Sequence, residues 1–220
     1  VLIDKAALIV DGRYTIQSAE ETDTAIVTPV KLEEMAAEGW IEANLPAGGR
    51  LGYDPWLHTP DQVKRLRAAA EKAGGCLVAV AANPVDAVWN DRPAAPAAPI
   101  HPHPLAFAGE EAVSKLARLV EALSKSKLDA LFVSDPHNLA WAFNLRGGDV
   151  GHTPLPRGFA LIPRVGRPTL FLDPAKMTAA AVEALAPLAD IAAPEALAAA
   201  LATLGAVKAM VRFDSATAPS

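Results

Sequence analysis

The chain has 220 residues, of which 51% are hydrophobic, enough to build a sizeable core in one domain or two. Its 20 basic and 25 acidic residues give a formal net charge of −5, and the basic residues are scattered, which argues against a nucleic-acid surface. No apolar run approaches the roughly 20 residues that span a bilayer, and the first residues do not resemble a signal peptide. We therefore expect a cytoplasmic protein. The single cysteine, Cys76, lies in an apolar run and is predicted to be a buried small hydrophobe.

Strand and helix patterns alternate along the chain, which predicts an α/β protein with a largely internal sheet. In the first part we expect strands over residues 6–10, 24–28, 50–54 and 76–81. Helices are predicted over residues 31–37, ending at Gly39, and from Pro60 to Gly74, with Thr59 as the N-cap. No Met precedes Val1, so we expect the chain to be part of a longer one.

Residues 92–104 hold five prolines, which predicts a stiff, extended connection between domains. Beyond it, apolar spacing predicts an amphipathic helix over residues 109–127 and then a strand over 129–133. A hairpin is predicted from strands 158–163 and 168–172. Two alanine-rich helices and a final strand follow, over residues 174–186, 194–204 and 207–214.

Residues 135–150 join an apolar helical pattern to the densest group of polar residues in the chain. Asn138 is expected to cap the helix and Trp141 to pack inward. Four polar residues are then left to cluster at the end of the helix: Asn144, Arg146, Asp149 and His152. Gly147 and Gly148 leave this loop free to move, as is common in substrate-facing loops. For Arg146 two roles stay open: contact with a substrate, or a structural salt bridge to Asp149.

Other charged and aromatic positions favour structural roles or contacts between domains, and they are Asp11, Arg13, Asp54, Trp89 and Arg92. Asp11 and Arg13 can also form an anion grip, but pairing of Arg13 with a buried carboxylate is favoured. His58 is expected to pack on Trp56 or to bond to the backbone.

Common compact catalytic signatures are absent from the sequence, including the zinc-protease, phosphate-loop and nucleophile-elbow patterns. No histidine has a carboxylate partner at a spacing that puts both on one helix face. His101 and His103 share one side of an extended segment and can in principle bind a metal, but solvated linker residues are the favoured interpretation. We therefore predict no metal site within this chain.

Four blocks in this order resemble the N-terminal region of the larger Xaa-Pro aminopeptidases, the aminopeptidase P enzymes of the creatinase and prolidase superfamily. The blocks are residues 11–14, 52–59, 89–93 and 135–149. The resemblance implies two creatinase-like N-terminal domains, each a mixed sheet flanked by helices in a ribonuclease-H-like arrangement. Residues 1–107 would be part of the first domain and residues 108–220 the second.

The resemblance also implies a C-terminal catalytic domain of the pita-bread fold that this chain lacks. That domain would hold two divalent metals, usually manganese, and hydrolyse the N-terminal Xaa-Pro bond of peptides. The fragment itself would bind no cofactor and be inactive alone. Its partners would be its own catalytic domain, proline-containing peptides and, because family members are often dimers, a second copy, with no nucleic acid or membrane.

By the same resemblance, residues 141–147 approach an active site, often a neighbouring subunit's, while the N-terminal domains shape substrate access and assembly. The substrate-proximal residues would be Arg146 first, with Asn144 and Trp141, and then Asp149 and His152. An alternative is a creatinase-like scaffold or binding domain of a homologue that has lost its metals.

Overall fold

The computed structural model describes residues 1–220, which divide into two compact units. The first comprises Val1–Asn90 with Pro219–Ser220, and the second comprises Asp91–Ala218. No helix in either unit is long and apolar enough to cross a membrane.

The structure divides the chain after Asn90, earlier than the expected boundary between residues 107 and 108. The reason lies in the second half of the proline-rich segment. Ile100 is fully buried in the core of the second unit, and the strand β5 (His101–Pro102) pairs with β7 (Leu145–Arg146) of that unit. Proline-rich backbone thus serves here as an edge of the second unit as well as a connection.

The first unit contains two parallel strand pairs and several short helices. Its strands are β1 (Ala6–Val10), β2 (Val27–Lys31), β3 (Arg50–Tyr53) and β4 (Cys76–Ala79). Its α-helices are α1 (Thr15–Glu21), α2 (Ala37–Asn44), α3 (Pro60–Lys72) and α4 (Pro84–Val88), and single 3₁₀ turns cover Gly12–Tyr14 and Pro55–Leu57. The helices α2 and α3 enclose a core that includes Ile41, Leu45, Val63, Ala70 and Leu77.

The prediction for α3 is confirmed in detail, because the Thr59 hydroxyl accepts from the Gln62 N–H while the Gln62 side chain accepts from the Thr59 N–H. The predicted helix over residues 31–37 is wrong. Parallel pairing with β1 extends β2 to Lys31, and the helix begins only at Ala37 and continues through Gly39. Tertiary pairing here outweighs local helix preference. Cys76 is also exposed rather than buried.

The second unit is built on a five-stranded mixed sheet in the order β10-β9-β8-β6-β11. Its strands are β6 (Ala130–Val133), β8 (Phe159–Pro163), β9 (Thr169–Phe171), β10 (Asp190–Ala192) and β11 (Val211–Arg212). β8 runs antiparallel to both β6 and β9, which confirms the predicted hairpin, whereas β10 and β11 are parallel to their neighbours. The helices are α5 (Leu105–Ala108), α6 (Ala112–Lys125), α7 (Pro136–Phe143), α8 (Ala179–Leu185) and α9 (Leu197–Ala206).

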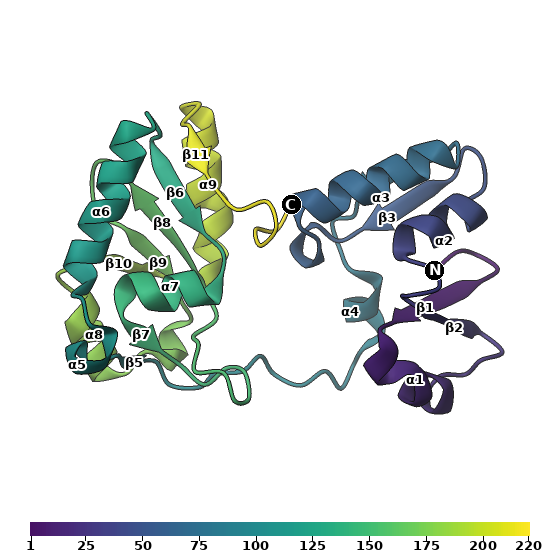
Figure 1. The fold of residues 1–220 in the computed structure, drawn as a ribbon, viewed down its shortest axis with the longest axis horizontal. Helices are drawn as coiled ribbons and strands as arrows, with labels where there is room; N and C mark the ends of the chain where they lie inside the picture. The colour runs from purple at the N-terminus through teal and green to yellow at the C-terminus, as the bar shows by residue number, and fades with distance from the viewer. The chain divides into compact units, whose positions relative to one another are not determined.

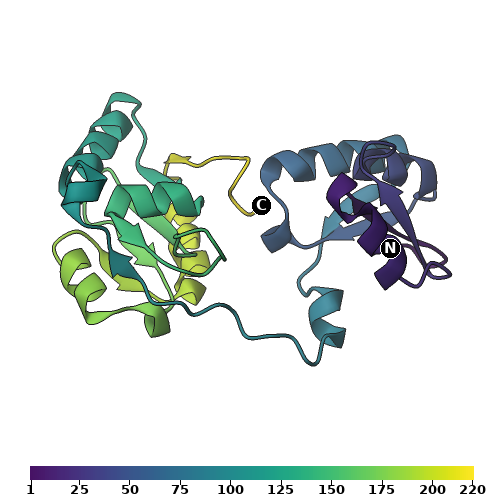
Figure 2. The ribbon, with the colours of Figure 1, turned by 60° about the horizontal axis from the view of Figure 1, so that its bottom comes forward.

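Helices cover both faces of this sheet, as Figures 1 and 2 show. Along β8 the side chains alternate, so that Ile162 joins the core under α6, α7 and α8 while Leu161 joins the cluster that contains Leu197 of α9. Each such buried aliphatic side chain contributes about 1.5–3 kcal/mol relative to exposure. The expectation of an α/β fold with a mixed sheet between helices is confirmed for this unit.

Several predicted bounds in this unit change. A 3₁₀ turn at Pro174–Lys176 precedes α8, and another at Pro194–Ala196 leads directly into α9, so both α-helices begin later than the sequence suggested. The Thr178 hydroxyl accepts from the Ala181 N–H and thereby sets the start of α8. The final strand is limited to Val211–Arg212, because only these residues pair with β6.

Candidate functional site

The helix α7 begins and ends at polar residues that fix its position. The Asp135 carboxylate accepts from the Asn138 N–H at 3.0 Å, so Asp135 is the N-cap and the expectation that Asn138 caps the helix is wrong. Asn138 lies one turn further in, where its backbone N–H is the group to be capped. At the other end Asn144 adopts a left-handed conformation (φ 50°, ψ 54°) that leads the chain into β7.

Trp141 lies on the outward side of α7, and 43% of its surface is exposed. The expectation that it packs inward is wrong. Leu139, Ala142 and Phe143 occupy the buried side of the helix, and the helical period leaves Trp141 on the opposite side. A large exposed aromatic side chain on a rigid helix is a better contact for a ligand than a buried one.

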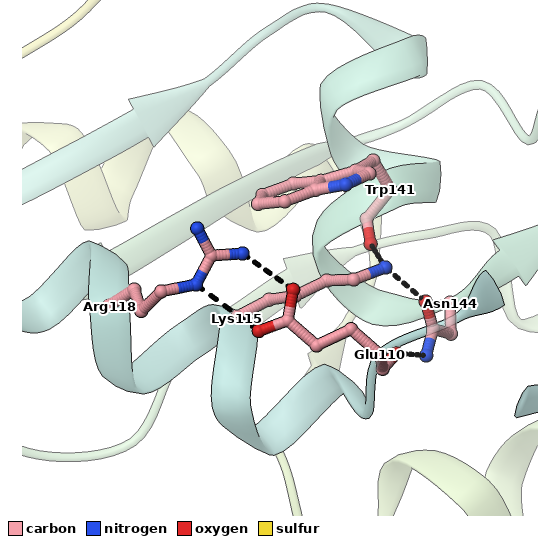
Figure 3. A network of polar contacts seen from close by, with 5 residues as sticks. All are labelled: Glu110, Lys115, Arg118, Trp141 and Asn144. Atoms are coloured by element: carbon pink, nitrogen blue, oxygen red, sulfur yellow. Dashed lines mark hydrogen bonds and ion pairs between the residues drawn. The ribbon is translucent and has the colours of Figure 1, made fainter.

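Trp141 belongs to a polar cluster, here called the Trp141 cluster, which consists of Glu110, Lys115, Arg118, Trp141 and Asn144 (Figure 3). The Lys115 ammonium donates to the Trp141 carbonyl at 3.0 Å and to Asn144 Oδ1 at 2.6 Å. Asn144 Nδ2 donates to the Glu110 carbonyl at 2.9 Å. The start of α6 is thus tied to the end of α7 through side chains.

The indole of Trp141 is held over two cations. Lys115 Nζ lies 5.0 Å and the Arg118 guanidinium carbon 5.6 Å from the centre of the ring. Arg118 in turn donates two hydrogen bonds to the Glu110 carboxylate, at 3.1 and 2.6 Å. Each cation–π contact contributes about 0.5–2 kcal/mol, depending on how far it is desolvated. The arrangement restrains the indole while leaving part of it open to solvent.

Lys115 is an unusual residue, because it is only 3% exposed and no carboxylate pairs with it. Burial lowers the pKa of Lys115, Glu110 opposes the shift, and Arg146 and Arg118 lower it further. Burial likewise lowers the pKa of His103, and Arg146 and Lys115 add to the effect. The cations of this region therefore lie close enough to act on one another.

Arg146, on β7, has no carboxylate partner. Its Nη1 donates to the Leu145 carbonyl at 2.8 Å, and the backbone of β7 pairs with β5, where His101 lies opposite Arg146. The alternative of an Arg146–Asp149 salt bridge is wrong, because Asp149 is taken by other groups. Arg146 is half-buried and keeps further N–H donors for a ligand.

Asp149 is a structural residue in this unit. Its side chain is fully buried and accepts from Lys176 Nζ at 2.9 Å, from the Arg157 N–H at 2.7 Å and from the Ala98 N–H at 3.3 Å. Burial alone would raise the pKa of Asp149, but the hydrogen bonds from Arg157, Lys176 and Ala98 outweigh it and lower the pKa. The Asp149 carboxylate is thus committed to three donors, none of which belongs to Arg146.

The glycines beside Arg146 do not leave the loop free. A Cβ on Gly147 would lie 2.8 Å from Pro156 Cα and 2.9 Å from its nitrogen, so glycine is required by close backbone approach. A Cβ on Gly148 would lie 3.3 Å from that of Ala98. His152 is exposed at the following turn, with φ 59°. The structure thus joins Trp141 and Asn144 through Lys115, on which Arg146 acts electrostatically, while Asp149 is committed to a buried pair with Lys176.

In the first unit Asp11 and Arg13 pair with each other at 2.7 Å, and the Asp11 carboxylate also accepts from the Arg13 N–H. Arg13 is 81% exposed and its partner is 34% exposed, so the expected pairing with a buried carboxylate is wrong. Hydrogen bonding by Arg13 lowers the pKa of Asp11. The pair closes the 3₁₀ turn at Gly12–Tyr14.

Asp54 has a similar local role, because its carboxylate accepts from the Trp56 N–H at 2.8 Å and from Asn83 Nδ2 at 2.9 Å. His58 Nδ1 bonds to the Asp54 carbonyl at 2.9 Å, in line with the predicted backbone contact. Trp89 and Arg92 are exposed, and their role in domain contacts stays a prediction.

Trp141 also borders a cavity of about 470 Å³. Its lining includes Asp135, Asn138, Trp141, Leu131, Arg212 and Phe213. It lies where the parallel strands β6 and β11 end, the edge at which ligands commonly bind in α/β sheets.

No three side chains of His, Cys, Asp or Glu come together closely enough to hold a metal ion.

Lys115, Arg118 and Glu110 were not anticipated from the sequence. A usable signal was the spacing of α6, where Lys115 falls within the buried stripe formed by Ala112, Leu116 and Leu123. A lysine at such a position requires a local set of acceptors.

Comparisons with known proteins agree with the architecture of the second unit. The profile of the creatinase/prolidase N-terminal domain matches residues 91–219. A probable Xaa-Pro aminopeptidase P from Coccidioides posadasii is 35% identical over 188 residues, which cover 84% of this chain and 29% of the relative. One from Paracoccidioides brasiliensis is 35% identical over 182 residues, covering 81% of this chain and 29% of the relative.

Among solved structures, an X-prolyl aminopeptidase from Caenorhabditis elegans superposes with a TM-score of 0.85 at 24% identity. The match covers 97% of this chain and 36% of that one, which is described as a cytosolic enzyme with a di-nuclear active site. The present chain thus spans about 29% of the length of these curated relatives. The profile match and the shared fold show that the chain belongs to the creatinase/prolidase N-terminal domain family.

Proposed function

We propose that this chain is a non-catalytic N-terminal module of a metal-dependent Xaa-Pro aminopeptidase. The two fungal relatives named above are probable Xaa-Pro aminopeptidases P, and the match covers 29% of each of them, while the profile of the creatinase/prolidase N-terminal domain matches residues 91–219 of this chain. Its own side chains gather no metal-ligand set. Bond cleavage would then belong to a catalytic domain that holds two divalent metals, usually manganese. The full-length protein would act in the cytoplasm, as a homodimer in this proposal.

The observation that identifies a specific binding surface is the exposed indole of Trp141, which is held over Lys115 and Arg118. Proline-rich peptides dock on aromatic surfaces because the proline ring is apolar and already conformationally restricted. An indole that is fixed before binding loses little entropy when it contacts such a ring. The Trp141 cluster is therefore suited to contact the proline side of a substrate.

Arg146 complements this surface with hydrogen-bond donors. Its guanidinium donates one hydrogen bond to the Leu145 carbonyl and has no carboxylate partner to neutralise it. The remaining N–H groups suit a peptide carbonyl or carboxylate. In this proposal the chain binds and orients the peptide and restricts access, while Asn144 and Lys115 hold the surface in place.

The test uses the full-length enzyme with an Xaa-Pro peptide and compares Trp141→Ala with Trp56→Ala. Trp56 is a suitable control because it is 60% exposed and lies in the first unit. We expect Trp141→Ala to lower kcat/KM by about tenfold, which is about 1.4 kcal/mol of transition-state stabilisation, and Trp56→Ala to have little effect. Equal kinetics for Trp141→Ala and the unmodified enzyme would contradict the proposed surface.

Two further outcomes separate the classes of function. The present chain, supplied with manganese and an Xaa-Pro peptide, should give no turnover that increases with protein concentration. A full-length protein without peptidase activity would instead favour a creatinase-like scaffold.

A further inference from the structure

The Trp141 cluster and its surroundings carry more positive than negative charge. Arg118 and Arg146 both act electrostatically on Lys115, and Glu110 is the only carboxylate among the groups that act on it. Glu110 is engaged with both the Nε and Nη2 groups of Arg118. The charges of Lys115 and Arg146 are left without a partner carboxylate.

The nearest candidates for neutralising Arg146 are occupied elsewhere. Asp149, three residues further on, is fully buried and bound to Lys176. Across the β5–β7 pair, the residue opposite Arg146 is His101. His103 follows β5 and is held toward its neutral form by burial and by the neighbouring cations. Neither supplies negative charge to the surface beside Trp141.

The two cations beside the ring, Lys115 and Arg118, also affect which ligand groups can pack on the Trp141 indole. An aromatic face attracts a cation through its quadrupole, and Lys115 and Arg118 already use that attraction at 5.0 and 5.6 Å. A further cation brought to the exposed part of the ring would be repelled by both. An apolar proline ring meets no such penalty, and a carboxylate beside it is attracted.

We infer that this surface gives the enzyme a charge preference, favouring peptides with a carboxylate on the C-terminal side of the proline and disfavouring those with a lysine or arginine there. The inference rests on the proposed function. The carboxylate can come from an acidic side chain or from the C-terminus of a short peptide. Arg146 is the group that would contact it, because its remaining donors suit a planar carboxylate, whereas Lys115 is buried and contributes only its field.

The test measures kcat/KM of the full-length enzyme for three tripeptide amides of the form Ala-Pro-Xaa. The third residue, Xaa, is glutamate, glutamine or lysine. A free-acid tripeptide with glutamine third, compared with its amide, separates the C-terminal carboxylate from an acidic side chain. We expect glutamate to exceed lysine by about tenfold, and the preference to fade near 1 M salt, where the Debye length is about 3 Å.

Arg146→Gln should reduce the glutamate-to-lysine ratio toward one, while Arg167→Gln should leave it unchanged. Arg167 is a matched control, since it lies on the same unit but pairs with Asp190. A ratio near one for the unmodified enzyme, or the same ratio in Arg146→Gln, would overturn the charge preference. If Trp141→Ala still lowers kcat/KM for the glutamine peptide in that case, the proposed function stands without this inference; if it does not, both fail.

Discussion

Lys115 donates a 2.6 Å hydrogen bond to the side-chain oxygen of Asn144, and this bond joins the first turns of α6 to the turn that follows α7. The same ammonium lies at the carbonyl end of α7, where a positive charge is favoured by the helix dipole. The Asn144 carbonyl also accepts from the His103 N–H at 2.7 Å, just beyond β5, the strand that pairs with β7. A single buried lysine thus helps to position Trp141 and the turn that leads to Arg146.

Replacing Lys115 by Met should destabilise the second unit by about 1–3 kcal/mol, because the Trp141 carbonyl and Asn144 Oδ1 lose their donor. Urea unfolding followed by tryptophan fluorescence measures the effect. Lys125→Met is the control, since Lys125 forms an exposed pair with Glu121 and should cost about 0.5 kcal/mol or less. Equal unfolding free energies for the two variants would remove the positioning role of Lys115.

The destabilisation by Lys115→Met should also depend on pH. Burial lowers the pKa of Lys115 below 10.5, so between the lowered pKa and 10.5 the unfolded state binds more protons than the folded state. The stability of the unmodified chain must then rise with pH relative to the variant. We expect a larger difference in unfolding free energy near pH 10.5 than at neutral pH, and a constant difference would contradict this electrostatic account.

The buried pair of Asp149 and Lys176 gives a second test of stability. Asp149→Ala leaves the Lys176 ammonium buried without its partner and should cost about 3–5 kcal/mol. Glu121→Ala breaks only an exposed pair and should cost about 0.5 kcal/mol or less. Thermal or urea unfolding at neutral pH compares them. Similar losses would show that Asp149 does not anchor the loop.

The stabilisation that Asp149 provides through its pair with Lys176 should be lost in acid. The pKa of Asp149 is lowered from 3.8, so its contribution is present above 3.8 and is lost as the pH falls through the lower folded value. The difference in unfolding free energy between Asp149→Ala and the unmodified chain should therefore become smaller in that acid range.

Gly147 offers a test of backbone packing beside Arg146. Gly147→Ala brings a methyl group against the backbone of Pro156 and should destabilise the unit by about 1–3 kcal/mol. Gly151→Ala meets no atom within 4 Å and serves as its control, with a change of about 0.5 kcal/mol or less. If both substitutions behave alike in thermal unfolding, glycine at position 147 is not needed for close approach.

The elements that the sequence predicted well have strong local signals. The helix α3 carries a cap, a proline at its first turn and a regular apolar face, and the hairpin of β8 and β9 has a glycine turn. The helix expected over residues 31–37 failed because pairing of Lys31 with Val10 is a contact between distant residues that local propensity does not contain.

The candidate site was predicted only in part, because the sequence signals are local and do not contain contacts between distant residues. The segment of residues 135–150 showed where polar groups gather, and two of them, Trp141 and Asn144, are joined through Lys115. Lys115 and Arg118, which contact Asn144 and Trp141, come from another helix. The burial of Asp149 depends on Lys176, which also lies outside the segment. Such pairings arise from tertiary packing, so sequence spacing within one segment could not assign them.

The central claim is that this chain recognises substrate for a catalytic domain outside it, and Arg146→Ala in the full-length enzyme tests it most directly. The measurement is kcat/KM on an Xaa-Pro peptide, together with the unfolding temperature. We predict a fall of about tenfold in kcat/KM, by a higher KM or a lower kcat, with an unchanged unfolding temperature, because no ion pair depends on Arg146. Wild-type kinetics for Arg146→Ala would contradict the account.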